Sequence, residues 1–168
     1  QNDEYGILEV GMDKKGEIDY LSKIIEPDVG VITNINYAHA KNFRNIQQIA
    51  LAKAEIINNI RTDGFVVLNT DDNFFELHKK IAHKKNLRVI SFGINNNKAN
   101  IKLINIKPYG KQFKIKISFN NKNKYFLLSD NFQNNIYNIL STIAVISIYQ
   151  NIFKLHRNIF LNFKIPVG

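Results

Sequence analysis

The sequence contains no cysteine among its 168 residues. Disulfide bonds are therefore excluded, and a reducing compartment such as the cytosol is allowed. No apolar run is long enough to suggest a membrane span, and no signal peptide is recognisable. A GxxxxGK[ST] phosphate-binding loop is also missing. Because the chain begins at Gln1 and stops shortly after Pro166, we expect a fragment of a longer protein, with one good core at this length.

Acidic residues are scarce in most of the chain. Residues 1–40 contain eight acidic and three basic residues, whereas residues 41–168 contain six acidic and twenty basic residues. The net charge of +9 would suit a nucleic-acid ligand, but the lysines are scattered over several expected elements. We therefore expect solvated lysines and no nucleic-acid partner. A basic nucleic-acid-binding module remains the alternative from a different functional class.

The first third of the chain has the pattern of a βαβ unit. Two short apolar runs, Gly6–Val10 and Val29–Thr33, flank a segment with helical periodicity over Glu17–Ile25. The strands of such a unit are parallel, and ligands gather beyond their carboxyl ends. Polar residues stand at or just after these ends, and they are the first candidates for a site: Glu9, Thr33, Asn34 and His39.

Lys53 is the third feature of this region. Apolar residues recur at helical spacing over Asn45–Ile60, and Lys53 falls between Ile49 and Ile56 on the stripe that should face the core. An unpaired buried charge is costly, so the amine must snorkel to solvent, pair with Glu9, or serve a phosphate or metal site. The pattern leaves these alternatives open.

Glu9 and His39 each allow two interpretations. Glu9 interrupts an apolar run, and a carboxylate buried there needs a cation, either Mg²⁺ or a salt-bridge partner. His39 follows the second run at the same expected edge of the sheet, where a histidine is either a surface residue or a ligand.

The rest of the chain predicts an α/β protein. Two more buried strands, two helices and three short alternating strands are expected over Gly64–Leu68, Leu87–Phe92, Asp72–His83, Phe132–Tyr149, Ile101–Ile106, Phe113–Phe119 and Tyr125–Leu128. The alternating strands form a small antiparallel meander within residues 99–128. A further helix is expected from Asn151 onward. The predicted fold is a mostly parallel sheet flanked by helices, with an antiparallel β extension.

A series of short motifs resembles the Mur ligases. The series reads LEVG, GEIDYL, PDVGVITNI, Ala38-His39, Phe43 and AKAEI within residues 5–72, and NNIYNIL resembles the family's HNxxNAL motif within residues 127–145. The resemblance implies a partial central ATP-binding domain of P-loop type, with its phosphate loop upstream of Gln1 and another domain beyond Gly168. The chain departs from the family pattern at Asp13-Lys14, Asn36, Lys41, Ser129-Asp130 and Asn134.

The resemblance also implies roles for individual residues. Glu9, His39 and Lys53 would hold Mg²⁺, with Lys53 carbamylated so that its amine becomes an oxygen ligand, and Lys53 and His39 would serve catalysis. Asn135 and Asn138 would contact the adenine of ATP, although asparagine also suits a helix start. Asn69 and Asp72 would lie near the nucleotide, although capping and a tight turn explain them equally well.

The implied activity is ATP-dependent amide formation through an acyl phosphate. The motif series is closest to the members that add D-alanyl-D-alanine to UDP-N-acetylmuramoyl-tripeptide in peptidoglycan precursor synthesis. We expect a cytoplasmic protein, monomeric at full length, and a fragment that is inactive by itself. A sister ligase, adding the third peptide residue or resembling folylpolyglutamate synthase, is the alternative within the superfamily.

Overall fold

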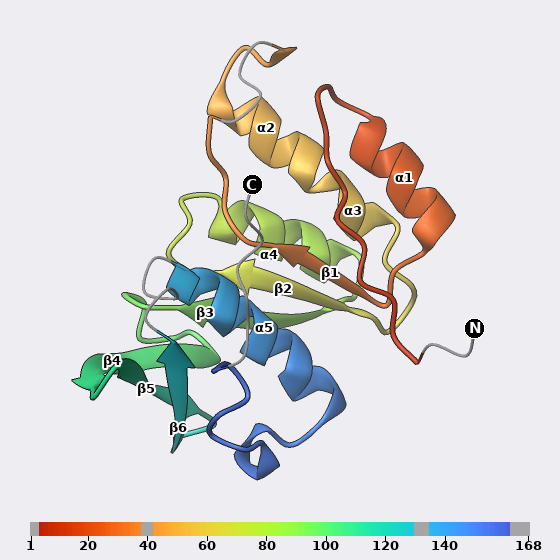
Figure 1. Cartoon of the computed structure of the whole chain (residues 1–168). Coiled ribbons are helices and arrows are strands. Elements are labelled where there is room, and N and C mark those ends of the chain that lie inside the picture. Colours follow the sequence, from red (N-terminus) through yellow and green to blue (C-terminus); the bar gives the residue numbers. More distant parts are fainter. Residues whose placement is uncertain (1–3, 38–41, 130–134, 162–168) are drawn as a thin grey trace.

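The computed structural model describes residues 4–37, 42–129 and 135–161. Six strands form one sheet in the order β1-β2-β3-β4-β5-β6. The strands are β1 (Val29–Ile32), β2 (Phe65–Asn69), β3 (Arg88–Gly93), β4 (Ile101–Tyr109), β5 (Gln112–Phe119) and β6 (Lys122–Ser129). The helices are α1 (Glu17–Ile25), α2 (Ile46–Lys53), α3 (Glu55–Asn58), α4 (Phe75–Lys84), α5 (Ile136–Tyr149) and the short 3₁₀ helix η3 (Ile152–Lys154) (Figure 1).

The sheet changes direction at β4. Strands β1, β2 and β3 are parallel, with Val31 opposite Val67 and Val67 opposite Ile90. Strand β4 pairs with β3 over two residues only and then continues into the antiparallel β4-β5-β6 meander. The predicted fold, a mostly parallel sheet with an antiparallel extension, is confirmed.

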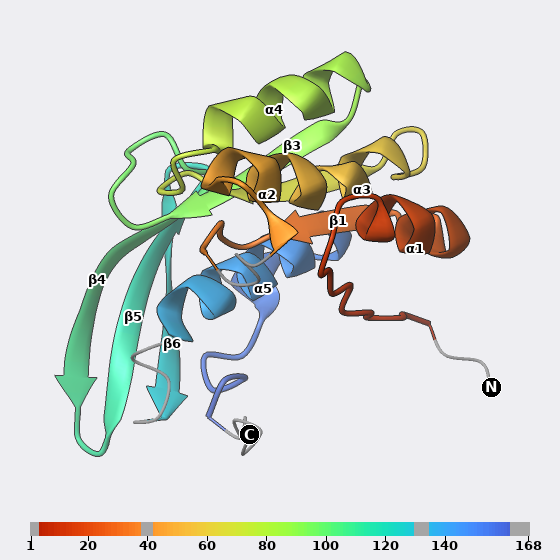
Figure 2. The same cartoon turned by 90° about the horizontal axis from the view of Figure 1, so that it is seen from above.

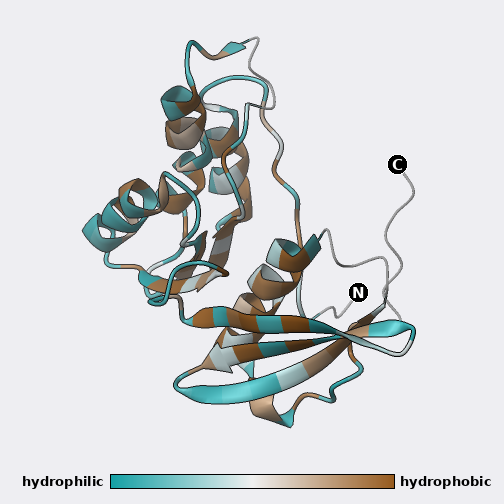
Figure 3. Ribbon diagram, turned by 90° about the vertical axis from the view of Figure 1, so that its left-hand side faces the viewer, coloured by the Kyte–Doolittle hydropathy of each residue, from teal (hydrophilic) through white to brown (hydrophobic). Residues whose placement is uncertain are grey.

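Helices cover both faces of the parallel strands. Strand β2 shows this by alternation: Val66 and Leu68 pack into a core with α1 to α4, whereas Val67 packs into a second core with α5 and the meander. Figure 2 shows α4 and α5 on opposite sides of the sheet. In Figure 3 apolar and polar residues alternate along the strands of the meander, and the apolar helix α5 lies beside them. The sheet is therefore the middle of three layers.

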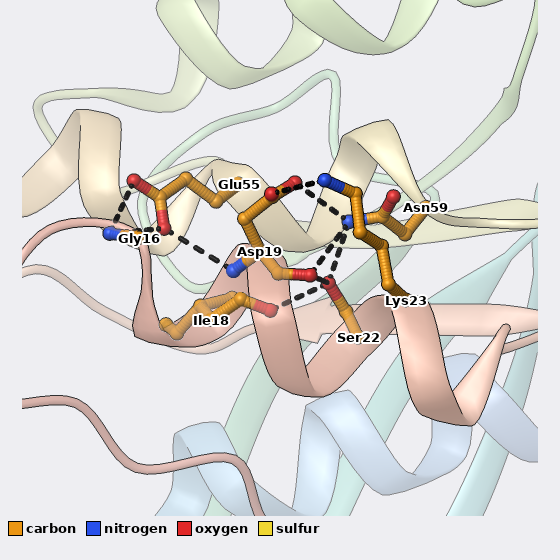
Figure 4. Close-up of polar contacts among 7 residues, drawn as sticks. All are labelled: Gly16, Ile18, Asp19, Ser22, Lys23, Glu55 and Asn59. Carbon is orange, nitrogen blue, oxygen red and sulfur yellow. Dashed lines mark hydrogen bonds and ion pairs between the residues drawn. The ribbon is translucent and has the colours of Figure 1, made fainter.

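A polar network fixes α1 against α3 (Figure 4). The carboxylate of Glu55 accepts hydrogen bonds from the backbone N–H of Gly16 at 3.0 Å and of Asp19 at 3.2 Å. The Asn59 amide donates to Asp19 Oδ1 and to Ser22 Oγ. Because the first N–H groups of a helix lack partners within it, Glu55 acts as a cap supplied by another helix.

Two sequence predictions are wrong, and a third is confirmed except for one break. Residues 6–10 form no strand; Ile7 in this segment is 98% exposed, because an apolar run becomes a strand only where a neighbouring strand accepts its hydrogen bonds. The helix expected over residues 45–60 is divided at Ala54 into α2 and α3, although the Ala54 N–H still bonds to Ala50 O at 3.0 Å. The helix expected from Asn151 is only η3 within the part of this region that the structure describes.

Candidate functional site

The carboxyl ends of β1 and β2 are joined by side-chain hydrogen bonds. Asn69, the last residue of β2, donates from Nδ2 to the carbonyl oxygen of Thr33 at 3.1 Å. Asp72 accepts the Ile35 N–H at 2.8 Å through Oδ2 and the Phe74 N–H at 2.8 Å through Oδ1. Both candidate residues therefore shape the edge of the sheet through backbone contacts, which favours the turn-forming interpretation for their side chains.

Lys53 reaches this edge from the last residue of α2. Its amine is half-buried and donates to the carbonyl oxygen of Asn34 at 3.0 Å. Burial lowers the pKa of Lys53 below the usual lysine range, and the nearby charge of Asp72 opposes that shift. The lysine is therefore turned toward the residues that follow β1, in agreement with a position at the predicted site.

His78 was missed by the sequence analysis. It lies on α4, is 2% exposed, and its Nε2 stands 3.0 Å from the carbonyl oxygen of Ala50 on α2. Burial lowers the pKa of His78, and the contact with Ala50 and the charge of Asp72 act in the opposite direction. A neutral imidazole protonated at Nε2 fits this contact and holds α4 against the helix that carries Lys53. The signal in the sequence was helical spacing with Ala82, which shares the buried face.

Asp71 was also missed, and it has the largest set of partners at this edge. Its carboxylate accepts the backbone N–H of Ile94 at 2.5 Å, of Asn95 at 3.1 Å and of Asn96 at 3.0 Å. It also accepts the hydroxyl of Tyr137 at 3.1 Å. Asp71 thus joins the turn after β2, the loop after β3 and the first turn of α5.

The two candidate adenine contacts lie at the start of α5. Asn135 is the N-cap residue, is half-buried, and makes no side-chain capping bond. Asn138 is exposed, and its carbonyl oxygen accepts the hydroxyls of Ser141 and Thr142 at 2.8 Å each. The amide of Asn135 is therefore not used for the helix cap, which was the alternative to an adenine contact for this residue.

The metal candidates are less closely gathered. Glu9 is exposed in the segment before α1, and not buried in a strand as expected. His39 lies outside the described residues. Within the described ranges, no three histidine, aspartate or glutamate side chains are grouped in a way that could hold a metal ion.

The family model for the Mur ligase middle domain matches residues 1–146. The chain belongs to the Mur ligase family. A curated UDP-N-acetylmuramoyl-tripeptide–D-alanyl-D-alanine ligase of Rickettsia prowazekii is 37% identical over 122 residues, which is 71% of this chain and 26% of that protein. The chain thus spans about a quarter of the length of this relative.

Solved Mur ligases have the same fold as this chain. A crystal structure of MurF from Acinetobacter baumannii superimposes with a TM-score of 0.73 at 24% identity, over 84% of this chain and 30% of that one. MurF from Thermotoga maritima in complex with ADP gives a TM-score of 0.69 at 21% identity, over 83% of this chain and 31% of that one. At these identities the match supports the Mur ligase fold.

Among the residues that the structure describes, none of the helices combines the length and the apolar character that a membrane span requires.

Proposed function

We propose that this chain is the ATP-binding middle part of a ligase that adds D-alanyl-D-alanine to UDP-N-acetylmuramoyl-tripeptide. The carrying observation is the half-buried Lys53 amine, bonded to Asn34 O at the carboxyl ends of the strands in a Mur ligase domain. A relative matching 71% of the chain bears this activity in its name, and a structural neighbour was solved with ADP.

The proposed reaction has two steps. An oxygen of the tripeptide carboxylate attacks the γ-phosphorus of ATP; the bond to the β–γ bridging oxygen breaks and ADP leaves. The amine of the dipeptide then attacks the carbonyl carbon of the acyl phosphate, loses a proton, and inorganic phosphate leaves. Both steps would develop negative charge at the strand ends, where bound Mg²⁺ and hydrogen-bond donors would stabilise it.

The proposed metal ligands are Glu9, His39 and a carbamate on Lys53. A protonated lysine amine is a poor partner for Mg²⁺, whereas a carbamate offers oxygen ligands and keeps one N–H that can still donate to Asn34 O. Mg²⁺ held there would neutralise charge on the transferred phosphate. In this proposal Lys53 and His39 serve catalysis through the metal ion that they would hold.

The proposed nucleotide contacts are Asn135 and Asn138, whose amides carry both a donor and an acceptor for a purine edge. Asn69 and Asp72 support this end of the site through the bonds they make to Thr33 O and Ile35 N. The reaction needs no nucleic acid. We place the protein in the cytoplasm, where its precursor substrates would be made, and expect the full-length protein to be a monomer.

The activity is tested on the full-length protein that contains this segment. With ATP, UDP-N-acetylmuramoyl-tripeptide and D-alanyl-D-alanine, we expect stoichiometric phosphate release and a product mass equal to the sum of tripeptide and dipeptide less water. Reactions with a free amino acid, or with a folate and glutamate, test the sister ligases. Product from either of those pairs and none from the dipeptide would contradict the proposed specificity.

Lys53 is tested separately with Lys53→Ala, and Lys23→Ala serves as the matched control because Lys23 is an exposed helical lysine paired with Asp19. We expect loss of about 10²-fold or more in kcat for the first variant and no change for the second. ¹³C-bicarbonate should give a carbamate signal in the wild type and in Lys23→Ala only. Its persistence in Lys53→Ala, with full activity, would remove the assigned role.

A further inference from the structure

We propose that Asp71 and Tyr137 are positioning residues that fix the first turn of α5 and thereby set the purine selectivity of the nucleotide site. The inference rests on the function proposed above and deepens it, since it gives roles to two residues that were not among the candidate site residues. Asp71 follows β2, and Tyr137 stands between the two candidate adenine contacts, Asn135 and Asn138.

The carboxylate of Asp71 is held in place by the loop after β3. Three consecutive backbone N–H groups, of Ile94, Asn95 and Asn96, point at its carboxylate with distances between 2.5 and 3.2 Å. Charge-assisted bonds of this kind are short and strong, and three of them leave the carboxylate little freedom to turn. The loop after β3 therefore holds Asp71 in one orientation at the edge of the sheet.

A side-chain hydrogen bond links Asp71 to α5. The hydroxyl of Tyr137 donates to Asp71 Oδ2 at 3.1 Å across 66 residues of sequence. Its ring packs against the second core, beside α5 and the meander. Burial and then the charge of Asp71 raise the pKa of Tyr137, so the hydroxyl stays protonated and remains a donor. The start of α5 is thus anchored by a half-buried ring that packs against the second core and by a bond to a fixed carboxylate.

The neighbours of Tyr137 at the start of α5 are the two candidate adenine contacts. Asn135 and Asn138 are three residues apart, the spacing of neighbours on one side of a helix, and Tyr137 lies about 100° around the axis from Asn138. The tyrosine can therefore face the sheet edge while the two amides are free for a ligand. Asn135 makes no capping bond, and the bond from the Tyr137 hydroxyl to Asp71 ties this turn to the edge of the sheet. Hydrogen bonds distinguish adenine from guanine only if the two amides are held in fixed positions, because misplaced donors and acceptors bind both purines alike.

The test uses the full-length protein and compares Tyr137→Phe with Tyr149→Phe, a variant at the far end of the same helix. We expect Tyr137→Phe to raise the KM for ATP about five- to twentyfold with kcat within twofold, and to lower the ratio of kcat/KM for ATP over GTP. Tyr149→Phe should leave all three values unchanged. An unaltered KM and ATP/GTP ratio in Tyr137→Phe would overturn the inference while leaving the proposed function intact.

A second measurement uses Asp71→Asn and the double variant that combines Asp71→Asn with Tyr137→Phe. If the two residues act as one unit, the double variant should raise the KM for ATP no further than Asp71→Asn does. Effects that multiply would show that they act separately and would refute the proposal. A wild-type protein that does not use ATP would overturn the proposed function and this inference together.

Discussion

Two buried glycines at the amino ends of the parallel strands should respond differently to the same substitution. A methyl group on Gly64, just before β2, would lie 2.8 Å from two backbone carbonyl oxygens, those of Arg61 and Asp28, and 2.5 Å from Ile60 Cγ2. A methyl group on Gly30 in β1 would meet only side-chain atoms of Ile60 and Ile56, the nearest being Ile60 Cδ1 at 2.8 Å. Backbone atoms yield less than the end of a flexible side chain.

The expected costs follow from these contacts. Gly30→Ala should lower the free energy of unfolding by about 1–2 kcal/mol, and Gly64→Ala by about 3 kcal/mol or more, since overpacking typically costs 1–3 kcal/mol where neighbours can move. Ile60→Val removes Cδ1 and keeps both γ carbons, at a cost of about 0.5–1.5 kcal/mol by itself. In an Ile60→Val background, Gly30→Ala should become nearly neutral, whereas Gly64→Ala should cost as much as before.

The assay is urea unfolding of the three single and two double variants beside the wild type, followed by far-ultraviolet circular dichroism. The slope of the unfolding free energy with urea should be the same for all, so that the midpoints report stability. Equal costs for the two glycine variants, or rescue of Gly64→Ala by Ile60→Val, would refute the reasoning from backbone contact.

Further predictions concern capping, pH, the core and the surface. Glu55→Ala should speed amide hydrogen exchange in α1 about five- to thirtyfold, the equivalent of about 1–2 kcal/mol, and Glu55→Gln should do so less. Burial depresses the pKa of His78 in the folded state, so its contribution to stability is present above the pKa of the unfolded state, near 6.5, and is lost as the pH falls through the folded-state pKa. His78→Gln should therefore weaken the pH dependence of the urea midpoint between pH 7 and pH 5. Ile143→Ala, at a fully buried position of α5, should cost about 2–5 kcal/mol in urea unfolding. Arg61→Ala removes an exposed ion pair with Asp28 and should change the free energy of unfolding by less than about 1 kcal/mol.

Much of the fold could be predicted from local patterns. Helix α1 was predicted with the bounds that the structure has, because its apolar spacing and the proline after Glu26 both act within a few residues. The meander was predicted from alternation, and its strands are longer than expected because pairing extends them through Tyr109 and Ser129. The run at residues 6–10 failed for the opposite reason: its composition suits a strand, but no described strand pairs with it.

The candidate site was predicted less completely. Lys53 was identified because a lysine on an apolar stripe needs an explanation, and its contact with Asn34 O agrees with a place at the strand ends. Asn69 and Asp72 were considered as turn formers, and their backbone bonds agree with that interpretation. The proposed roles of Glu9, His39 and the two α5 asparagines stay predictions.

The sequence by itself determined the α/β class, the change from parallel strands to a meander, and the family, since periodicity and motif order are properties of short stretches. Only the tertiary structure decided which polar groups meet. Asp71 could be recognised as the centre of the strand-end contacts only once the loop after β3 and Tyr137 had been packed against it, across 23 to 66 residues. Likewise, burial of His78 against α2 and exposure of Glu9 depend on what the fold places beside them. Hydrogen bonding and desolvation act between neighbours in space, and packing chooses those neighbours.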